Sequence, residues 1–380
     1  MFTLAMVAGE PSGDLLGASL IKALRLQLPE LRIIGIGGPL MQEQGLEPLA
    51  DMEQLSIMGL VEVLSALPKL LALRRRVRQQ ILDAKASVFV GIDAPDFNLG
   101  LARSLKPSLH CIHYVSPTVW AWRPKRVFKI ERSVHQILCL FPFEPHYYQD
   151  LQLEAHYIGH PLADEIAIEP RQRQARQELE LAMDGKYLAI LPGSRSGEAQ
   201  RLMPVLIPLM QAWHQQHPEW QFLLPAANGR RYEQLYAALQ GLNLPVKLYH
   251  RQARLVMQAA NLGVIASGTA SLEAMLCHLP MVIVYRVHPL SWWLGSRLLK
   301  IANVGLPNIL AGSTLVPERL QADCQMDIIL QDLNQWLDDP ERLLHVREQY
   351  AFIHRRLSRQ AAQRAAEVVI NALHHSSSAR

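Results

Sequence analysis

The stretch TLAMVAGEPSGDLLGASLIKAL (residues 3–24) decides the fold. An apolar run typical of a strand leads into the glycine-containing turn 9–14, and apolar residues then recur at helical spacing. A strand, such a turn and a helix in this order form the first unit of a nucleotide-binding α/β fold. The turn resembles a phosphate loop, but Glu10 and Asp14 would repel a diphosphate. We therefore expect a nucleotide to bind elsewhere.

The composition is that of a globular enzyme with two domains. The chain has 380 residues, of which 49% are hydrophobic and 19% charged, and this length exceeds the usual size of one core. Its net charge of +4 is too small to indicate nucleic-acid binding, but it suits an anionic ligand or an anionic membrane surface. The four cysteines lack CxxC spacing, so we expect neither zinc nor disulfides, and a reducing cytoplasm fits. No signal peptide and no membrane span is expected.

Short apolar runs alternate with helical patterns along most of the chain, which predicts parallel sheets covered on both faces. The expected strands are residues 4–7, 32–36, 87–92, 111–115, 136–140, 155–158, 187–191, 221–224, 246–249, 262–265 and 281–284. The fold class is therefore α/β, with two Rossmann-like doubly wound domains facing a cleft, followed by C-terminal helices. The expected division is an acceptor- and membrane-facing N-terminal domain 1–165, a charged junction 166–186 and a UDP-sugar-binding C-terminal domain 187–345. Residues 346–380 are expected to form a C-terminal helix, with packing on the N-terminal domain as one option, and a disordered polar tail.

Two loops of the second half suit a nucleoside diphosphate. The strand 187–191 ends in PGSRSGE, where Gly193, Ser194 and Arg195 offer backbone N–H groups and a planar guanidinium. The strand 262–265 ends in ASGTASLEA, where Ser and Thr should cap a helix whose N-terminus attracts anions. Glu273 could accept hydrogen bonds from both ribose hydroxyls. Ordinary turns and a capping acid are the plain alternative for each loop alone. The expected nucleotide site is Gly193, Ser194, Arg195, Ser267, Gly268, Thr269, Ser271 and Glu273.

The strand 87–92 ends in DAPDFN, which places two acids and an amide at the presumed cleft. Asp93, nearest the strand end, is the candidate general base for an attacking hydroxyl, and Asp96 is the candidate helix cap. The plain alternative is a capping acid with Asn98 exposed. The expected acceptor-side residues are Glu10, Ser12, Gly13, Asp14, Asp96 and Asn98.

Two apolar segments flanked by cations fit an interface with anionic lipid. One is residues 57–76, where Pro68 should split or kink a helix; the other surrounds Trp292 and Trp293. A buried crossover helix explains the first segment equally well. The expected membrane or acyl-chain contacts are Val61, Val63, Leu64, Leu67, Leu70, Leu71, Trp292 and Trp293.

No metal motif is present. The sequence contains no Walker A, GxGxxG dinucleotide fingerprint, Asp-x-Asp pair or HExxH. The histidines at 110 and 113 alternate along a strand and fit core and surface positions better than ligation. The aromatic and basic stretch 114–126 fits packing of two indoles better than stacking on nucleic acid, with contact to a lipid or sugar acceptor as a third option.

Seven motifs carry a close resemblance to the lipid-A-disaccharide synthase family, inverting glycosyltransferases of bacterial outer-membrane lipid synthesis. They are VAGEPSGD, GIDAPDFN, YVSPTVWAWRPKRVFKI, IGHP, LPGSRSGE, ASGTASLEAM and LPNILAG. They follow the family's order and cover roughly the first 310 residues.

The resemblance implies the glycosyltransferase-B fold and a specific reaction. The reaction is transfer of 2,3-diacylglucosamine from UDP to the primary hydroxyl of 2,3-diacylglucosamine 1-phosphate, without metal or other cofactor. The family's catalytic aspartate falls on Asp93, its diphosphate-binding arginine on Arg195 and its nucleotide-contacting acid on Glu273. The asparagine of LPN, near the nucleotide, falls on Asn308. The resemblance also implies a peripheral protein on the cytoplasmic face of the inner membrane, and a homodimer with exchanged C-terminal parts.

Three rival functions share parts of this pattern. A UDP-sugar 2-epimerase has the same fold and an acid-containing ribose loop, but needs no lipid contact. A peptidoglycan-pathway glucosaminyltransferase has the same architecture with a different N-terminal glycine loop. A non-catalytic nucleotide-sensing membrane adaptor is disfavoured by the two acids after the strand 87–92.

Overall fold

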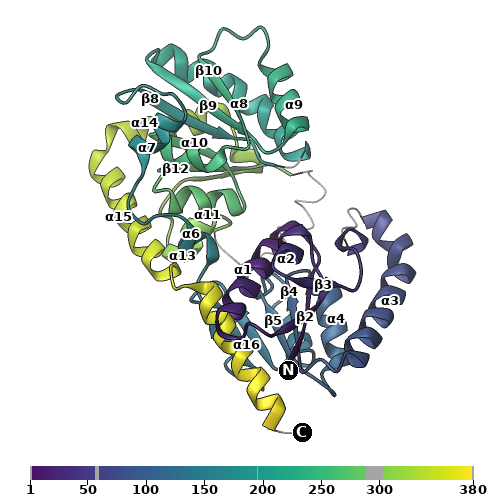
Figure 1. The fold of residues 1–380 in the computed structure, drawn as a ribbon. Helices are drawn as coiled ribbons and strands as arrows, with labels where there is room; N and C mark the ends of the chain where they lie inside the picture. Colours follow the sequence, from purple (N-terminus) through teal and green to yellow (C-terminus); the bar gives the residue numbers. More distant parts are fainter. Residues whose placement is uncertain (1, 56–59, 195, 288–302, 379–380) are drawn as a thin grey trace. The chain divides into compact units, whose positions relative to one another are not determined.

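The computed structural model describes residues 2–55, 60–194, 196–287 and 303–378, and the side chains of residues 60–67, 196, 377 and 378 are outside the description. The chain forms two compact units (Figure 1). Unit 1 comprises Met1–Asp164 and Leu357–Arg380, and unit 2 comprises Glu165–Arg356. The charged segment 166–186 belongs to unit 2, because Arg176 is buried there and its guanidinium donates to Ala259 O and Asn261 Oδ1, each at 3.0 Å.

Unit 1 is built on a seven-stranded parallel sheet in the order β3-β2-β1-β4-β5-β6-β7. Its strands are β1 (Thr3–Ala8), β2 (Arg32–Ile36), β3 (Leu46–Pro48), β4 (Val88–Ile92), β5 (His110–Tyr114), β6 (Gln136–Cys139) and β7 (Glu154–Tyr157). Its helices are α1 (Pro11–Gln27), α2 (Pro39–Glu43), α3 (Leu60–Asp83), α4 (Pro95–Leu105), α5 (Arg126–Glu131) and α16 (Ala361–Ser378), with the 3₁₀ turns η1 (Met52–Leu55) and η2 (Glu144–Tyr148). The first five strands have the Rossmann order.

The strands β1 and β4 at the centre of the unit 1 sheet are almost entirely apolar because helices cover both faces of the sheet. In β1, Leu4 and Met6 pack in one core with α1 and α16, whereas Ala5 and Val7 pack in the other with α3 and α4. Successive side chains of a strand point to opposite faces, so both sets are withdrawn from water. The helix α3 contains Pro68. The proline therefore does not split it, contrary to one outcome predicted from the sequence.

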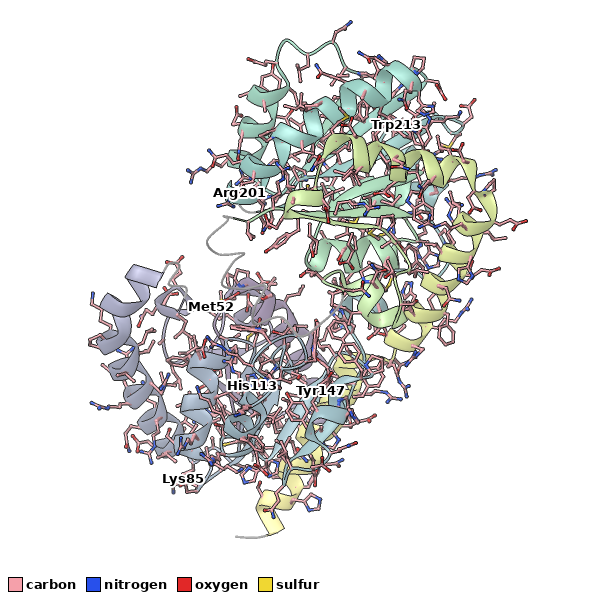
Figure 2. All side chains as sticks on the ribbon, turned by 180° about the vertical axis from the view of Figure 1, so that it is seen from behind. Met52, Lys85, His113, Tyr147, Arg201 and Trp213 are labelled. Atoms are coloured by element: carbon pink, nitrogen blue, oxygen red, sulfur yellow. The ribbon has the colours of Figure 1, made fainter. Side chains whose placement is uncertain are left out.

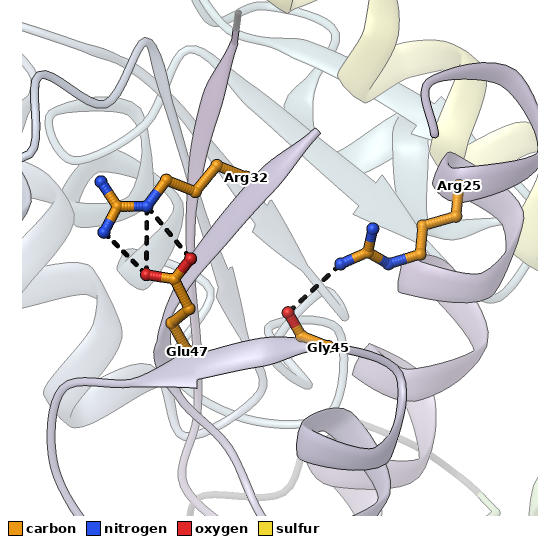
Figure 3. A network of polar contacts seen from close by, with 4 residues as sticks. All are labelled: Arg25, Arg32, Gly45 and Glu47. Atoms are coloured by element: carbon orange, nitrogen blue, oxygen red, sulfur yellow. Dashed lines mark hydrogen bonds and ion pairs between the residues drawn. The ribbon is translucent and has the colours of Figure 1, made fainter. Parts of the chain in front are cut away.

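The edge strand β3 was not predicted. It is three residues long, and polar contacts join it to its neighbours (Figure 3). The Arg32 guanidinium of β2 binds Glu47, with Nη2 at 2.7 Å from Oε2, and Arg25 Nη2 of α1 donates to Gly45 O at 3.3 Å. The ion pair is half exposed, and solvent screening leaves such pairs only a small contribution to stability.

The C-terminal helix α16 completes unit 1 by packing against α1 (Figure 1). Asp164 caps its first turn, where the carboxylate accepts from the backbone N–H groups of Gln360 at 2.9 Å and Ala361 at 2.6 Å. The helix continues to Ser378, so the tail 374–378 is helical rather than disordered as the sequence predicted. One contact at that end is the edge-to-face packing of His374 on Phe2, with ring centroids 5.5 Å apart.

Unit 2 repeats the same topology with a six-stranded parallel sheet in the order β10-β9-β8-β11-β12-β13. Its strands are β8 (Lys186–Leu191), β9 (Trp220–Ala226), β10 (Val246–His250), β11 (Leu262–Ala266), β12 (Met281–Tyr285) and β13 (Glu318–Leu320). Its helices are α7 (Gln172–Glu178), α8 (Ser196–Gln216), α9 (Gly229–Leu239), α10 (Ala253–Ala259), α11 (Thr269–Leu276), α13 (Leu306–Ala311), α14 (Met326–Asp338) and α15 (Pro340–Leu357), with η3 (Gln321–Asp323). The short α6 (Pro161–Glu165) and the end of α15 lie where the chain passes between the units.

Each unit buries ring side chains, of which Figure 2 labels Trp213 in unit 2 and His113 in unit 1. Trp213 of α8 is fully buried in unit 2, with Trp220 packed edge to face at 5.3 Å between ring centroids. His113 of β5 is buried in unit 1, and burial lowers its pKa to about 3. His113 is therefore a neutral core residue, in agreement with the interpretation of the 110–113 histidines as strand neighbours.

Candidate functional site

The carboxyl ends of β1, β4 and β5 meet at one edge of the unit 1 sheet. The register pairs Ala8 with Ile92 and Ile92 with Tyr114, so the loops that follow these strands are neighbours. Ligands of parallel α/β sheets bind at this edge. The loops carry the residues after Ala8, the pair Asp93–Ala94, and the segment from Val115.

Backbone strain gathers at the same edge. Asp93 and Ala94 have φ of 50° and 41°, and Val115 at the end of the next strand has φ of 81°. Positive φ is uncommon for residues other than glycine and an outlier for a β-branched one. Each such residue costs about 1–3 kcal/mol and persists where the surroundings enforce it, commonly at functional sites. The strain supports a functional role for this edge.

Asp93 is half-buried directly after β4, and Ser12 at the start of α1 donates a hydrogen bond to its carboxylate. Burial raises the pKa of Asp93, while hydrogen bonds from the Ala94 N–H and the Ser12 hydroxyl act against that rise. A carboxylate with a raised pKa is better suited to accept a proton than an exposed one. The assignment of Ser12 to the acceptor side stays a prediction, and in the structure its hydroxyl acts on the pKa of Asp93 through a hydrogen bond.

Asp96 does not have the position that the sequence predicted, and the buried position of Asn98 excludes the plain alternative of an exposed side chain. The N-cap of α4 is Ala94, without a side-chain cap, so Asp96 is not the cap. The Asp96 side chain is 90% exposed, and its Oδ1 lies 2.7 Å from Arg126 Nη2. Asn98 is fully buried rather than exposed. Its amide Nδ2 donates to three main-chain carbonyls around the Asp93 turn, at 2.9–3.1 Å.

The acids of the first turn separate in the structure. Asp14 is buried, and its two carboxylate oxygens accept from the backbone N–H groups of Leu40 at 3.1 Å and Met41 at 3.0 Å. Asp14 thus caps α2, a role that its sequence position alone could not reveal. Glu10 is exposed at the N-cap of α1 without a side-chain hydrogen bond to the helix. Gly13 is buried under the strand ends, where an added Cβ would lie 3.2 Å from Ala8 Cβ.

The aromatic loop after β5 is organised by a glutamate that the sequence reasoning missed. Glu144 is buried and accepts from the N–H groups of Leu140 at 2.9 Å and Phe141 at 3.0 Å, and from Trp120 Nε1 at 3.3 Å. Burial raises the pKa of Glu144 to about 7. Trp120 is buried and Trp122 stacks on Arg123, so packing explains both indoles. The signal in the sequence was an acid shortly after a buried strand, in FPFEP.

In unit 2, the two glycine-containing loops also meet at one sheet edge. The neighbouring strands β8 and β11 pair Leu191 with Ile265, which places the loops 192–194 and 267–268 side by side. Gly193 and Gly268 have φ of 99° and 133°, values that favour glycine. Arg195, the predicted phosphate ligand, lies outside the described residues, and Ser194 next to it is exposed.

The predicted capping of α11 by Ser267 and Thr269 is wrong. The N-cap is Gly268, without a side-chain cap. Ser271 is fully buried, and its Oγ donates to Gly268 O at 2.8 Å, which closes the first turn from inside. Ser267 N donates to Val284 O at 2.9 Å. Because no side chain caps α11, the N–H groups of its first turn are available to an anion.

Glu273 lies one turn into α11, where Arg254 of α10 holds it. Arg254 Nε donates to Glu273 Oε1 at 2.9 Å, and Arg254 Nη2 lies 3.2 Å from Glu165 Oε2. Arg254 is a second residue that sequence reasoning missed, because its partners are 19 and 89 residues away. The guanidinium fixes one oxygen of Glu273 and so orients the carboxylate.

Asn308 organises a loop through its buried side chain. Its Oδ1 accepts from the N–H groups of Leu315 at 2.8 Å and Val316 at 2.9 Å, and its Nδ2 donates to Val316 O and to Glu318 Oε1. Glu318 in turn accepts from the N–H groups of Val304 and Gly305. Both polar atoms of the Asn308 amide are therefore bound within unit 2, and its contact with a nucleotide stays a prediction.

Most of the residues predicted to contact lipid lie outside the part of the chain that the structure describes. Trp292 and Trp293 lie outside the described residues, and so do the side chains of Val61, Val63, Leu64 and Leu67. Of the remainder, Leu70 is half-buried and Leu71 is 40% exposed on α3. None of the helices in the described ranges is long and apolar enough to cross a membrane. Within those ranges there is also no group of three His, Cys, Asp or Glu side chains that could hold a metal ion.

Comparison with solved structures identifies the class of fold. MurG of Acinetobacter baumannii is 13% identical with a TM-score of 0.59, over 97% of this chain and 99% of that one. UDP-GlcNAc 2-epimerase of Neisseria meningitidis, solved with UDP-GlcNAc, is 11% identical with a TM-score of 0.63, over 98% and 99%. Two Rossmann-like units with parallel sheets and C-terminal helices are the glycosyltransferase-B fold, as the sequence predicted.

Comparison of sequences identifies the family. The family model for lipid-A-disaccharide synthetase matches residues 4–372. The lipid-A-disaccharide synthases of Methylobacillus flagellatus and Pseudomonas savastanoi are each 43% identical, over 98% and 99% of this chain and 99% and 98% of the relatives. The chain belongs to the lipid-A-disaccharide synthase family, and it is a glycosyltransferase that uses a UDP-sugar donor.

Proposed function

We propose that the protein transfers 2,3-diacylglucosamine from UDP-2,3-diacylglucosamine to the primary hydroxyl of 2,3-diacylglucosamine 1-phosphate, with inversion. The products are the β-1,6-linked disaccharide 1-phosphate and UDP. The match to the family model over residues 4–372 carries this proposal. No metal or other cofactor takes part, and the UDP-sugar is the donor substrate.

In this reaction Asp93 accepts the proton of the acceptor hydroxyl while its oxygen attacks the anomeric carbon. The bond from that carbon to the diphosphate breaks, and the electron pair leaves with UDP. Burial supports the assignment because it raises the pKa of Asp93 and so makes the carboxylate a stronger base. The acceptor-side set is Glu10, Ser12, Gly13, Asp14, Asp96 and Asn98, within which Asp14 and Asn98 act through the backbone contacts described above.

Negative charge on the departing UDP is neutralised in unit 2. Arg195 and the N–H groups of Gly193, Ser194 and the α11 N-terminus bind the diphosphate, and Glu273 accepts from the ribose hydroxyls. The adjacency of the two loops at the β8–β11 edge supports this set, and so does the fixed orientation of Glu273 by Arg254. Preorganised donors of this kind stabilise developing charge without rearrangement.

We also place the protein on the cytoplasmic face of the inner membrane as a peripheral protein, with α3 and the segment around Trp292 toward an anionic lipid surface. The exposed Leu71 near Arg75 and Arg76, both exposed on the same helix, supports the α3 assignment. A homodimer belongs to the same proposal and rests on the resemblance.

The reaction is tested by incubating the protein with UDP-diacylglucosamine and the monosaccharide phosphate, with and without detergent micelles. Release of UDP that requires both lipids supports transfer. Interconversion of the UDP-sugar without acceptor would instead establish the epimerase, whose solved structures share the fold at a TM-score of 0.63. Binding of UDP without turnover would indicate the nucleotide-sensing adaptor.

Ser12→Ala is expected to move the acid limb of the pH–rate profile to higher pH. The Ser12 hydroxyl stabilises the ionised form of Asp93 and holds its pKa down, so its removal lets the pKa rise. The base must be deprotonated, and activity therefore falls as pH drops through that pKa. The measurement is kcat/KM against pH. An unmoved or downward-shifted acid limb would contradict the assignment of Asp93 or its contact with Ser12.

Arg195→Ala is expected to lower kcat by about a hundredfold, as for loss of one charge-stabilising donor in other enzymes. The measurement is the rate of UDP release at saturating donor. Arg201→Ala is the control, because Arg201 is an exposed arginine of α8 close to Arg195 in the sequence, and its Nη1 donates to Gly197 O. Equal rates for both variants would remove Arg195 from the site.

A further inference from the structure

The turn Asp93–Ala94 is held in its strained conformation from the core side by one amide. Asn98 Nδ2 donates to Val7 O at 3.1 Å, Ile92 O at 3.1 Å and Asp93 O at 2.9 Å. Val7 and Ile92 lie at the carboxyl ends of the neighbouring strands β1 and β4, and Asp93 lies in the turn itself. The side chain is fully buried, so water does not replace these bonds. Asn98 therefore joins the end of β1 to the strained residue that carries the carboxylate.

Glycines make room for this arrangement. A Cβ added to Gly91 would lie 2.9 Å from Asn98 Cβ, so glycine at 91 allows the amide to reach the strand ends. A Cβ added to Gly9 would lie 2.9 Å from Ala94 Cβ, a separation that real Cβ atoms essentially never show. The first glycine of VAGEPSGD thus admits the side chain of Ala94 from the opposite side of the turn.

We propose that Asn98 is the positioning residue of this enzyme, and that Asn98 from the core and the space at Gly9 together set the place of the Asp93 carboxylate. The inference rests on the proposed function of Asp93 as the base. The backbone at Asp93 and Ala94 is in the left-handed region, which aspartate tolerates and alanine disfavours. Without the amide, the turn would relax and the carboxylate would leave its place beside Ser12.

The first experiment measures kcat and KM of Asn98→Ala. A displacement of about 1 Å in a reacting group costs about a hundredfold in rate, so we expect kcat to fall about a hundredfold while KM for the UDP-sugar stays near the wild-type value. The matched control is Asn261→Ala in unit 2. Asn261 Oδ1 also accepts a main-chain hydrogen bond, from Tyr187 N at 2.9 Å. Asn261 is far from the Asp93 turn in the sequence. We expect this control to lower Tm and to keep kcat.

The second experiment tests the space at Gly9 and does not depend on the folding of Asn98→Ala. Gly9→Ala should lower kcat because its new Cβ pushes Ala94. The double variant Gly9→Ala/Ala94→Gly removes the colliding atom, and we expect it to recover most of the lost rate. Ala94→Gly alone is measured as the control, because glycine by itself suits the positive φ of 41° at this position.

Two results would overturn the inference while the proposed function stands. The first is that the wild type is active and that Asn98→Ala is folded and has the same kcat. The second is that Gly9→Ala loses activity and that the added Ala94→Gly does not restore it. A wild type without transfer activity would overturn the proposed function, and this inference with it.

Discussion

Asp93→Asn is expected to lower kcat by about a thousandfold, within the range that a general base contributes. The asparagine amide keeps the size of the side chain but cannot accept the proton of the acceptor hydroxyl. The fold should be retained. Asparagine tolerates the left-handed backbone at φ 50°, and a neutral side chain avoids the desolvation that raises the pKa of Asp93. The measurement is the rate of UDP release, with Tm determined in parallel.

The control for this variant is Asp83→Asn. Asp83 is an exposed acid at the end of α3, where its Oδ1 accepts from Gln79 Nε2 at 2.8 Å. We expect Asp83→Asn to keep the wild-type kcat. We expect the Tm of Asp93→Asn to be equal to or higher than that of the wild type. If Asp93→Asn turned over at a near-normal rate, Asp93 would not be the base and the mechanism would need another acceptor for the proton.

Asn308→Ala is expected to reduce the free energy of unfolding of unit 2 by about 4 kcal/mol, because each buried polar group that loses its partner costs about 1–3 kcal/mol. The change leaves the N–H groups of Leu315 and Val316, the carbonyl of Val316 and one oxygen of Glu318 without the amide. The measurement is urea denaturation followed by far-ultraviolet circular dichroism, with the slope compared between variants.

Asn334→Ala provides the comparison for that measurement. Its side chain bonds to Gln216 and His217 at the surface of unit 2, where water can replace lost partners, so we expect a loss under about 1 kcal/mol. If both variants unfolded at a similar urea concentration, the buried network around Asn308 would not stabilise unit 2.

The sheets were largely predictable, because their strands are apolar on both faces. The expected strand 32–36 agrees with β2, and each of the other ten overlaps a strand of the structure. The missed strands β3 and β13 are three residues long and polar. They depend on partners distant in sequence: Arg32 binds Glu47 across 15 residues, and Arg319 binds Asp332 across 13. No local pattern specifies such pairing.

The positions of the candidate loops at the sheet edges were predictable, but their hydrogen bonds were not. Strand ends and turn residues identified the loops around Asp93, Gly193 and Gly268, because parallel strands bring these loops together. The helix caps were predicted wrongly or not predicted at all. Asp14 caps a helix that begins 25 residues later, and the N-cap of α11 is a glycine. Such contacts arise when the sheet assembles, so residue type and spacing do not encode them.

The return of the chain to unit 1 at Leu357 has a consequence for biogenesis. Residues of α16, including Ala365, Val369 and Leu373, form part of the same core as Leu4 and Met6. They leave the ribosome after all of unit 2, which lies between the two pieces of unit 1 and is synthesised in one continuous stretch. The first strands to be made must therefore wait, with one apolar face incompletely covered, until α16 has been synthesised. Unit 2 can complete its fold before unit 1.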